Sequence, residues 1–229
     1  MFDKHYYVNN KQNEKRLALS FYKKVIKRYI NPKTLLDYGC GTGWFLSEIN
    51  SLTQIQKTYG YEISEYAFEK ANQNSNGSKI IRDLSYIKSH SLDCISALHV
   101  FEHISDDQLR EILIDFRRIL KETGSIILVM PAKDGFAHHL KNNNWIGFYD
   151  KTHINLKDYD GWINFFKKNK LGVEKSASDG LWDFPYKISN FPIKFFKIIF
   201  LMIIQIFFGR LSISYNDGES FIFILKFKK

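Results

Sequence analysis

The strongest constraint on this fold is a regular alternation of apolar runs and amphipathic segments over the first 131 residues. The apolar runs have the length of strands and lie at 34–39, 58–63, 79–84, 92–100 and 125–131. Helical spacing of apolar residues occurs at 13–30, at 42–52, directly after Ser64 and at 105–122, where Gly124 is expected to end the helix. Because the strands are apolar on both faces, the pattern predicts an α/β fold, with helices on both sides of a mostly parallel sheet.

The last third of the chain is less regular. Residues 133–156 are polar and contain histidines, so they predict a loop, longer than a simple connection needs. A helix at 157–170, a strand from Leu171, an apolar helical insertion at 191–208 and a final strand at 219–228 follow. We expect a single domain over 1–229, made of an N-terminal part (1–32), a core (33–132) and a C-terminal part (133–229).

The charge of the chain favours an anionic partner. There are 33 basic and 24 acidic residues, a formal net charge of +9, which suits nucleic acid, a phosphorylated substrate or a membrane surface. The lysines are scattered, so a merely lysine-rich surface remains an alternative. The two cysteines, Cys40 and Cys94, lie in apolar runs and are expected to be reduced and buried. With no apolar core in MFDKHYYVNN to form a signal peptide, we expect a cytoplasmic protein.

The apolar segment at 191–208 has two possible uses. Lys194 and Lys197 leave only 198–208 uninterrupted by charge, and Gln205 lies inside that stretch. A bilayer-spanning helix needs roughly 20 apolar residues, so this segment is too short to span comfortably. It is expected either to pack on the protein body or a second copy, or to lie on the inner face of the membrane with its lysines at the headgroups.

The glycine-rich stretch LLDYGCGTGW, residues 35–44, predicts a ligand site. Gly39, Gly41 and Gly43 form G-x-G-x-G, whereas a dinucleotide-binding loop has its third glycine where Trp44 stands. A phosphate-binding loop would also need a lysine. The carboxylate of Asp37, at the end of the preceding strand, would repel phosphates and attract a cation. These features favour S-adenosylmethionine, which has no phosphate and carries a sulfonium and an ammonium.

Two further acids follow the next two predicted strands. Glu62 ends the second strand, where a carboxylate can accept both ribose hydroxyls, and Asp83 ends the third, where it suits an adenine amino group. Leu84 would lie against the ring. Each acid alone could instead cap a helix or turn. Together with Asp37 they predict one crevice at the carboxyl ends of the strands.

Five motifs, in order, resemble class I S-adenosylmethionine-dependent methyltransferases: LLDYGCGTGWFL, YGYEIS, IIRDL, LDCISALHVFEHI and LREILIDFRRILKETGSIILVMP. The resemblance implies a Rossmann-like, seven-stranded sheet with an antiparallel last strand, and S-adenosylmethionine as methyl donor, leaving S-adenosylhomocysteine. HYY, residues 5–7, resembles the N-terminal lid of such enzymes. The resemblance also implies cofactor contacts from Asp37, Gly39, Cys40, Gly41, Gly43, Glu62, Ile63, Asp83, Leu84, Leu98 and His99.

Two histidines are the predicted catalytic residues. A hydroxyl acceptor needs a base, whereas an amine needs only its neutral form. VFEHI resembles the family's LEH motif, in which the residues equivalent to Glu102 and His103 usually hold the start of a helix. His153 lies in DKTHINL, in a segment that resembles bacterial methyltransferases of polysaccharide and glycan pathways. We predict that His153 and His103 act on the acceptor; the alternative for His153 is that it only pins its loop.

A metal is not expected, but one metal hypothesis stays open. His99, Glu102 and His103 form H-x-x-E-H, which resembles the E-x-x-E-H of ubiquinone-pathway and small-RNA methyltransferases except at its first position. That resemblance implies a divalent-ion site to which His153 could contribute. Nitrogen in place of an oxygen ligand would favour zinc, manganese or iron over magnesium.

The expected function is O- or N-methylation of a sugar, a glycan or another phosphorylated or lipid-linked small molecule. Trp182 and Tyr186 offer flat faces of the kind that stack on sugar rings. The alternatives are a quinone-type lipid methyltransferase, an RNA methyltransferase and a non-catalytic cofactor-binding partner subunit. Nucleic acid is disfavoured because no arginine-rich face or appended module is present. The expected contacts through 191–208 are a membrane surface or a second copy of the chain.

Overall fold

The computed structural model describes residues 2–10, 13–186 and 192–228. Position 191 of the predicted apolar insertion, and positions 1 and 229 of the predicted domain, lie outside them. The strands are β1 (Thr34–Tyr38), β2 (Lys57–Tyr61), β3 (Lys79–Ile81), β4 (Leu92–Leu98), β5 (Leu120–Pro131), β6 (Leu171–Ser178) and β7 (Ser220–Phe227). The α-helices are α1 (Lys4–Asn9), α2 (Leu17–Tyr29), α3 (Trp44–Asn50), α4 (Glu65–Asn74), α5 (Asp106–Ile119), α6 (Phe136–Lys141), α7 (Ile146–Tyr149), α8 (Tyr159–Lys168) and α9 (Pro192–Phe208). Short 3-10 helices are η1 (Leu84–Tyr86), η2 (Phe101–His103) and η3 (Asn142–Asn144).

The seven strands form one sheet in the order β3-β2-β1-β4-β5-β7-β6. β1 pairs in parallel with β2 and with β4, and β2 pairs in parallel with β3. β6 and β7 are antiparallel to each other. The predicted α/β, Rossmann-like fold is therefore confirmed, including the antiparallel pairing of the last strand.

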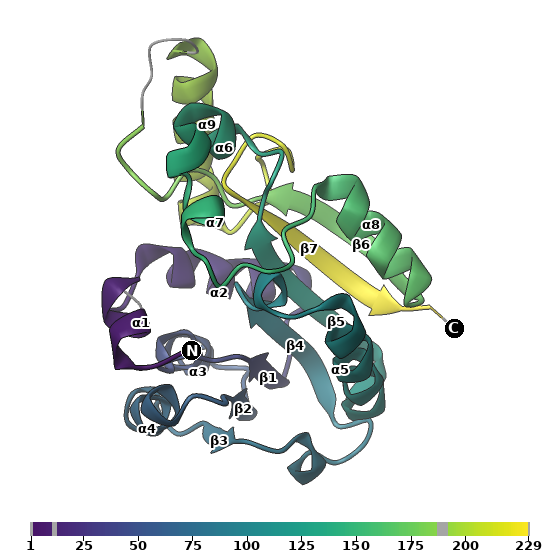
Figure 1. Ribbon diagram of the computed structural model, residues 1–229. Coiled ribbons are helices and arrows are strands. Elements are labelled where there is room, and N and C mark those ends of the chain that lie inside the picture. The colour runs from purple at the N-terminus through teal and green to yellow at the C-terminus, as the bar shows by residue number, and fades with distance from the viewer. Residues whose placement is uncertain (1, 11–12, 187–191, 229) are drawn as a thin grey trace. The chain divides into compact units, whose positions relative to one another are not determined.

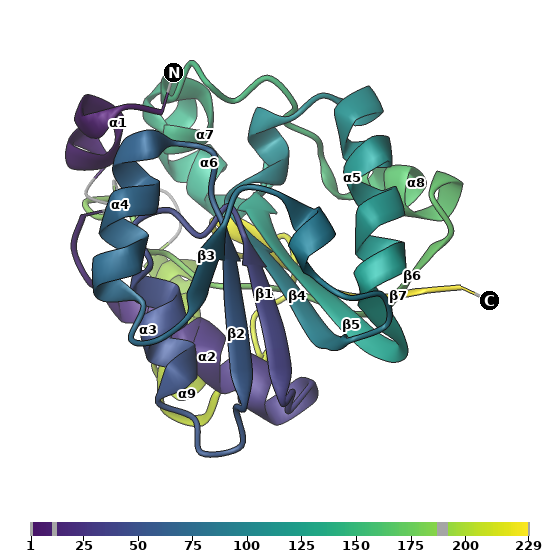
Figure 2. The same ribbon diagram turned by 90° about the horizontal axis from the view of Figure 1, so that it is seen from below.

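The chain divides into two compact units, Met1–Leu98 with Ile114–Ile127, and His99–Leu113 with Leu128–Lys229. In the first unit α3 packs beside β2 and α4 beside β3, as Figure 2 shows. Ser64 caps α4 as predicted, because its hydroxyl accepts a hydrogen bond from the N–H of Ala67 at 3.3 Å. Cys40 and Cys94 are buried free thiols of this unit, as predicted.

In the second unit α8 packs along β6, and α9 lies close to α6 (Figure 1). Asp158 caps α8 through a hydrogen bond from the N–H of Gly161. Trp162 and Phe166 of α8 are fully buried. Buried side chains of α6 and α9, among them Phe136, Leu140, Phe195, Ile198 and Met202, form a separate apolar cluster. The single domain expected over 1–229 stays a prediction.

The predicted end of α5 was wrong. The helix ends at Ile119, and the residues predicted to continue it up to Gly124 begin β5 instead. The carbonyls of Arg118 and Ile119 accept hydrogen bonds from the N–H groups of His90 and Ser91, at 2.9 Å each. These long-range bonds occupy carbonyls that a continued helix would need, so the chain leaves the helix five residues before the glycine.

The polar loop predicted at 133–156 was also wrong in part, because it contains α6, η3 and α7. In α6, Phe136, Ala137 and Leu140 are buried on one side of the helix. Polar neighbours such as His138 and His139 conceal this short helical pattern in the sequence. The segment from Asp150 to α8 does lack regular structure.

Candidate active site

The turn between β1 and α3 requires its glycines. Gly39, Gly41 and Gly43 all have positive φ, at 72°, 53° and 85°. A side chain at Gly43 would also place its Cβ 2.8 Å from the Cα of Ala71 in α4. The three glycines let the backbone turn tightly, and Gly43 also lets the start of α3 lie close to α4.

Asp37 is the buried acid of this turn. Its residue is 3% exposed, and its Oδ1 accepts a hydrogen bond from the Ser96 hydroxyl at 2.7 Å. Burial, with a smaller contribution from Glu62, raises the pKa of Asp37 to about 7, although the Ser96 hydrogen bond acts in the opposite direction. Among the described residues no basic side chain forms an ion pair with it. A buried carboxyl with only a neutral partner is well suited to a cationic ligand.

Glu62 connects the glycine turn to the end of β2. Its carboxylate accepts hydrogen bonds from the N–H groups of Gly41 at 2.9 Å and Ser64 at 2.8 Å. Burial raises the pKa of Glu62 against the lowering effect of those bonds and of the Tyr7 hydroxyl. Tyr7 belongs to α1 and is buried, so the segment resembling a lid contacts this acid. Glu62 therefore organises the turn and leaves lone pairs for further donors.

Asp83 has a different environment from the other two acids. It is exposed, and both of its oxygens accept hydrogen bonds from Ser85, at 2.8 Å from the N–H and 2.6 Å from the hydroxyl. These bonds lower the pKa of Asp83. Asp83 thus caps η1, which is the alternative to a cofactor contact that the sequence allows for a strand-end acid. Leu84 beside it is buried.

The structure places the three acids at the carboxyl ends of neighbouring strands, and the crevice expected between them stays a prediction. Asp37 lies in β1, Glu62 directly follows β2 and Asp83 follows β3, and these strands are parallel neighbours. Of the other predicted cofactor contacts, Cys40 is buried, Ile63 is largely exposed, and Leu98 and His99 are partly exposed at the end of β4. The cofactor contacts themselves stay predictions.

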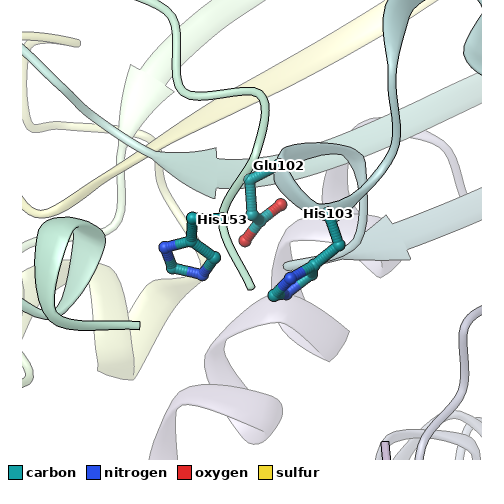
Figure 3. Close-up of side chains that lie close together, drawn as sticks. All are labelled: Glu102, His103 and His153. Carbon is teal, nitrogen blue, oxygen red and sulfur yellow. The ribbon is translucent and has the colours of Figure 1, made fainter. Parts of the chain in front are cut away.

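A second constellation lies in the other unit, where Glu102, His103 and His153 point toward one another (Figure 3). Their possible ligand atoms all lie within 4.8 Å of one another. Glu102 and His103 come from η2, and His153 comes from the segment that follows α7. The backbone joins the two segments, because the N–H of Asn155 donates to the carbonyl of Glu102 at 2.9 Å.

Glu102 is the most unusual member of this cluster. It is fully buried, and neither carboxylate oxygen has a hydrogen-bond partner within the described part of the chain. Nδ1 of His99, a residue with a positive φ of 57°, lies 3.4 Å from Oε1 in a contact without hydrogen-bond geometry. Burial opposes ionisation, yet the surrounding histidines, His99 first, lower the pKa of Glu102 overall. A buried, ionised carboxylate in this position requires a positive charge nearby, such as a protonated histidine or a bound cation.

Backbone carbonyls orient the two imidazoles of the cluster. Nδ1 of His103 lies 3.2 Å from the carbonyl and 2.9 Å from the hydroxyl of Thr152, and this hydroxyl donates to Asp150. Nδ1 of His153 lies 2.9 Å from the carbonyl of Gly147. Because a carbonyl can only accept, both Nδ1 atoms donate, and both Nε2 atoms carry a lone pair in the neutral rings. Burial, the largest effect on it, lowers the pKa of His103 and keeps that ring neutral.

The grouping agrees with the sequence hypothesis in including His153 and differs from it in leaving out His99. Glu102 and His103 are joined by His153, and His99 stands beside Glu102 without entering the three-residue cluster. Sequence reasoning missed the supporting roles of Asp150, Thr152 and Asn155. The motif DKTHIN contains all three, at its first, third and sixth positions. Tyr186, considered for sugar stacking, is buried and donates to Glu219 at 3.1 Å.

Comparison with known proteins identifies the family. A protein family described as a methyltransferase domain matches residues 10–175, which is more than half of the chain. The chain therefore belongs to this methyltransferase family, and its cofactor is S-adenosylmethionine.

The curated relatives are distant. An uncharacterized methyltransferase of Geobacillus sp. (strain WCH70) is 23% identical over 150 residues, covering 61% of this chain and 70% of that protein. An uncharacterized protein of Methanocaldococcus jannaschii is 27% identical over 142 residues, covering 60% of this chain and 59% of that protein. The match thus spans less than two thirds of the second relative's own length.

Solved structures share the fold. The plantazolicin methyltransferase BpumL, in complex with a triazolic desmethylPZN analog and S-adenosylhomocysteine, has a TM-score of 0.65 and 18% identity, covering 97% of this chain and 89% of its own. A methyltransferase of Archaeoglobus fulgidus, described as dependent on S-adenosylmethionine, has a TM-score of 0.59 and 17% identity, covering 97% and 100%. At these identities the likeness concerns the fold alone.

Proposed function

We propose that this chain methylates an oxygen or nitrogen atom of a sugar, a glycan or another phosphorylated or lipid-linked small molecule. The observation that carries the methyl-donor side is Asp37, a buried carboxyl with a neutral partner beside a turn of left-handed glycines. When bound, S-adenosylmethionine supplies an electrophilic methyl group on a positively charged sulfur. The residues present suit that group, because they combine close backbone approach with negative charge.

On the acceptor side we assign the proton transfer to His153. For a hydroxyl acceptor, the O–CH3 bond would form as the S–CH3 bond of the donor breaks and S-adenosylhomocysteine leaves, and the proton of the broken O–H bond would go to Nε2 of His153. Its Nδ1 hydrogen bond to Gly147 holds the ring in the tautomer that this step requires. Glu102 and Asp150 would stabilise the resulting imidazolium, because Nε2 of His153 lies 3.8 Å from Asp150 and within the cluster of Glu102. His103 completes the cluster as the second proposed catalytic residue.

A second role for the same cluster, as a divalent-cation site, is favoured by the unpartnered carboxylate of Glu102. A possible ligand nitrogen of each histidine lies within 4.8 Å of a carboxylate oxygen of Glu102, and Nδ1 of each ring donates to a backbone carbonyl, as the second nitrogen of metal-binding histidines commonly does. One carboxylate and two imidazoles suit zinc, manganese or iron. A titration with Co²⁺, followed by its visible absorption, would separate the roles. A tetrahedral cobalt spectrum that Glu102→Gln abolishes would support the cation site. If the wild type gives no such spectrum, the cation site is refuted and the role of His153 as a base is the one that stands.

The acceptor class is tested by a methyl-transfer screen of the full chain. Nucleotide sugars, lipid-linked glycans, quinol precursors and RNA would each be incubated with S-adenosylmethionine, and S-adenosylhomocysteine release measured. We expect turnover with the sugar or lipid-linked acceptors. Turnover with RNA alone would contradict the proposal, and cofactor binding without turnover on any class would favour a non-catalytic partner subunit. The cytoplasmic location remains a proposal.

A further inference from the structure

The helix α9 is held on the second unit by one face only. Phe195, Ile198 and Met202 of that face are buried in the apolar cluster shared with α6. Gln205, fully buried, donates to the carbonyls of Ser178 and Asp179 at 3.2 and 3.3 Å, and accepts from the N–H groups of Ser212 and Ile213 at 2.8 and 3.1 Å. These hydrogen bonds fix the rotation of the helix about its own axis. They therefore determine which side chains of α9 point away from the second unit.

The outward side of α9 is apolar. We call it the α9 face and define it by side chains at positions i, i+3, i+7, i+10 and i+14, which form one stripe on a helix. Their exposed fractions are large: Ile193 86%, Phe196 63%, Phe200 63%, Ile203 48% and Phe207 69%. Isolated apolar residues at a surface are ordinary, but a continuous stripe of this size marks an interaction site.

The charged residues in and near α9 in the sequence are mostly basic. The sequence from 184 to 216 contains no acidic residue, and its basic residues include Lys194, Lys197 and Arg210. Lys194 pairs with Asp217 at 2.7 Å. Lys197 and Arg210 are exposed and form no ion pair with any described residue. Lys197 lies beside the stripe, where its aliphatic stem can follow the apolar surface while its ammonium reaches outward.

We propose that the α9 face docks on a bilayer surface that contains anionic lipid headgroups, with the helix lying in the plane of the interface. Apolar side chains flanked by unpaired basic groups are the pattern of interfacial helices. A second copy of the chain is disfavoured, because a symmetric contact of this face would bring the unpaired Lys197 and Arg210 of two copies together, while the nearby acid Asp217 already pairs with Lys194. Crossing the bilayer is excluded for α9 by its packed inner face, and no helix of the described residues has the length and hydropathy to cross.

The proposal rests on the proposed function in one respect, which is the use of membrane docking. A docked enzyme would reach a lipid-linked acceptor at the bilayer surface in which that acceptor is anchored. Docking itself depends only on α9. The two claims can therefore fail separately.

The experiment is flotation of the full chain with vesicles of phosphatidylcholine alone and with added phosphatidylglycerol. We expect binding to the anionic vesicles that weakens as salt is raised. Phe200→Ser should lower the partition coefficient about tenfold or more, because a large apolar group no longer enters the interface. Lys197→Glu should lower it about tenfold on anionic vesicles, since it reverses one charge. Ile114→Ser, at an equally exposed apolar residue outside α9, is the matched control and should change nothing.

Three outcomes would overturn the proposal. The wild type could fail to bind anionic vesicles, Phe200→Ser could bind as well as wild type, or light scattering could show a dimer that Phe200→Ser dissociates without any vesicle binding. Calorimetry with S-adenosylmethionine on the same variants tests the proposed function separately from membrane docking. If the wild type does not bind S-adenosylmethionine, the proposed function is refuted. The vesicle-binding result would still decide the docking proposal.

Discussion

At the scale of single residues, the ionisation of Asp37 determines what the glycine turn can attract. Its raised pKa, about 7, means that the folded protein holds a neutral carboxyl below neutrality, whereas an unfolded chain would ionise it from about pH 4. Its contribution to folding stability is therefore fully present below pH 4 and is lost as the pH rises through 7. A cation bound beside Asp37 would instead favour the ionised carboxylate.

The affinity for S-adenosylmethionine should consequently rise with pH through 7. If only the ionised carboxyl pairs with the cofactor, affinity falls by up to about tenfold for each pH unit below the pKa. Calorimetric titrations at pH 6, 7 and 8 measure this dependence. Asp37→Asn should bind weakly with a flatter profile, and a pH-independent affinity in the wild type would contradict this role of Asp37.

Gln205 has a structural role that the sequence alone does not reveal. Within 198–208 it looks like an interruption of an apolar segment, but its amide satisfies two carbonyls and two N–H groups at the inner side of α9. Gln205→Leu should destabilise the protein by about 2–4 kcal/mol, because buried backbone groups lose their partners. Chemical denaturation measures the loss. Gln73→Leu, at an exposed site on α4, should be nearly neutral, and equal effects of the two changes would refute the structural role.

At the scale of elements, the β1 turn illustrates what sequence can predict. Gly39 and Gly41 are spaced for a tight turn, Ser64 precedes a helix, and acids stand at strand ends. Each of these signals is local, and each corresponds to an observed cap, turn or strand end. The end of α5 and the helix α6 could not be found in this way. The first depends on bonds from His90 and Ser91, remote in sequence, and the second on a short apolar pattern among polar residues.

The packing of α3 against α4 gives an element-scale prediction. Gly43→Ala should cost more stability than Gly77→Ala, although both glycines have positive φ, 85° and 92°. Backbone strain, about 1–2 kcal/mol, is common to both changes. Only Gly43 adds a clash, because its Cβ would meet the backbone of Ala71, whereas nothing lies within 4 Å at Gly77. Thermal unfolding of the two variants measures the difference, and equal losses would contradict this packing.

At the scale of the whole molecule, the proposed roles follow the two units. Asp37 and Glu62, proposed for the methyl donor, belong to one unit, and Glu102, His103 and His153 to the other. The sequence could suggest each half because its motifs are local. It suggested His153 as a further ligand beside Glu102 only through the resemblance to metal-binding methyltransferases; the proximity itself is created by a backbone bond from Asn155 and by the orienting carbonyls of Gly147 and Thr152.

The division predicts that the two functions can be lost independently. His153→Ala should lower turnover by about 10²- to 10⁴-fold, the usual contribution of a general base, while the affinity for S-adenosylmethionine stays unchanged. Steady-state rates and calorimetry measure the two quantities. His139→Ala, at an exposed histidine of the same unit, should leave both unaffected. Wild-type turnover in His153→Ala would show that this histidine only holds its loop.

The most direct test of the central claim is calorimetric titration of the full chain with S-adenosylmethionine at pH 8, for the wild type and Asp37→Asn, with Glu69→Gln as an exposed control of the same charge change. The buried acid is proposed to recognise a cationic, phosphate-free ligand. Binding in the wild type and in the control, largely lost in Asp37→Asn, is the predicted result. Unchanged binding in Asp37→Asn, or tighter binding of NAD than of S-adenosylmethionine to the wild type, would contradict the account.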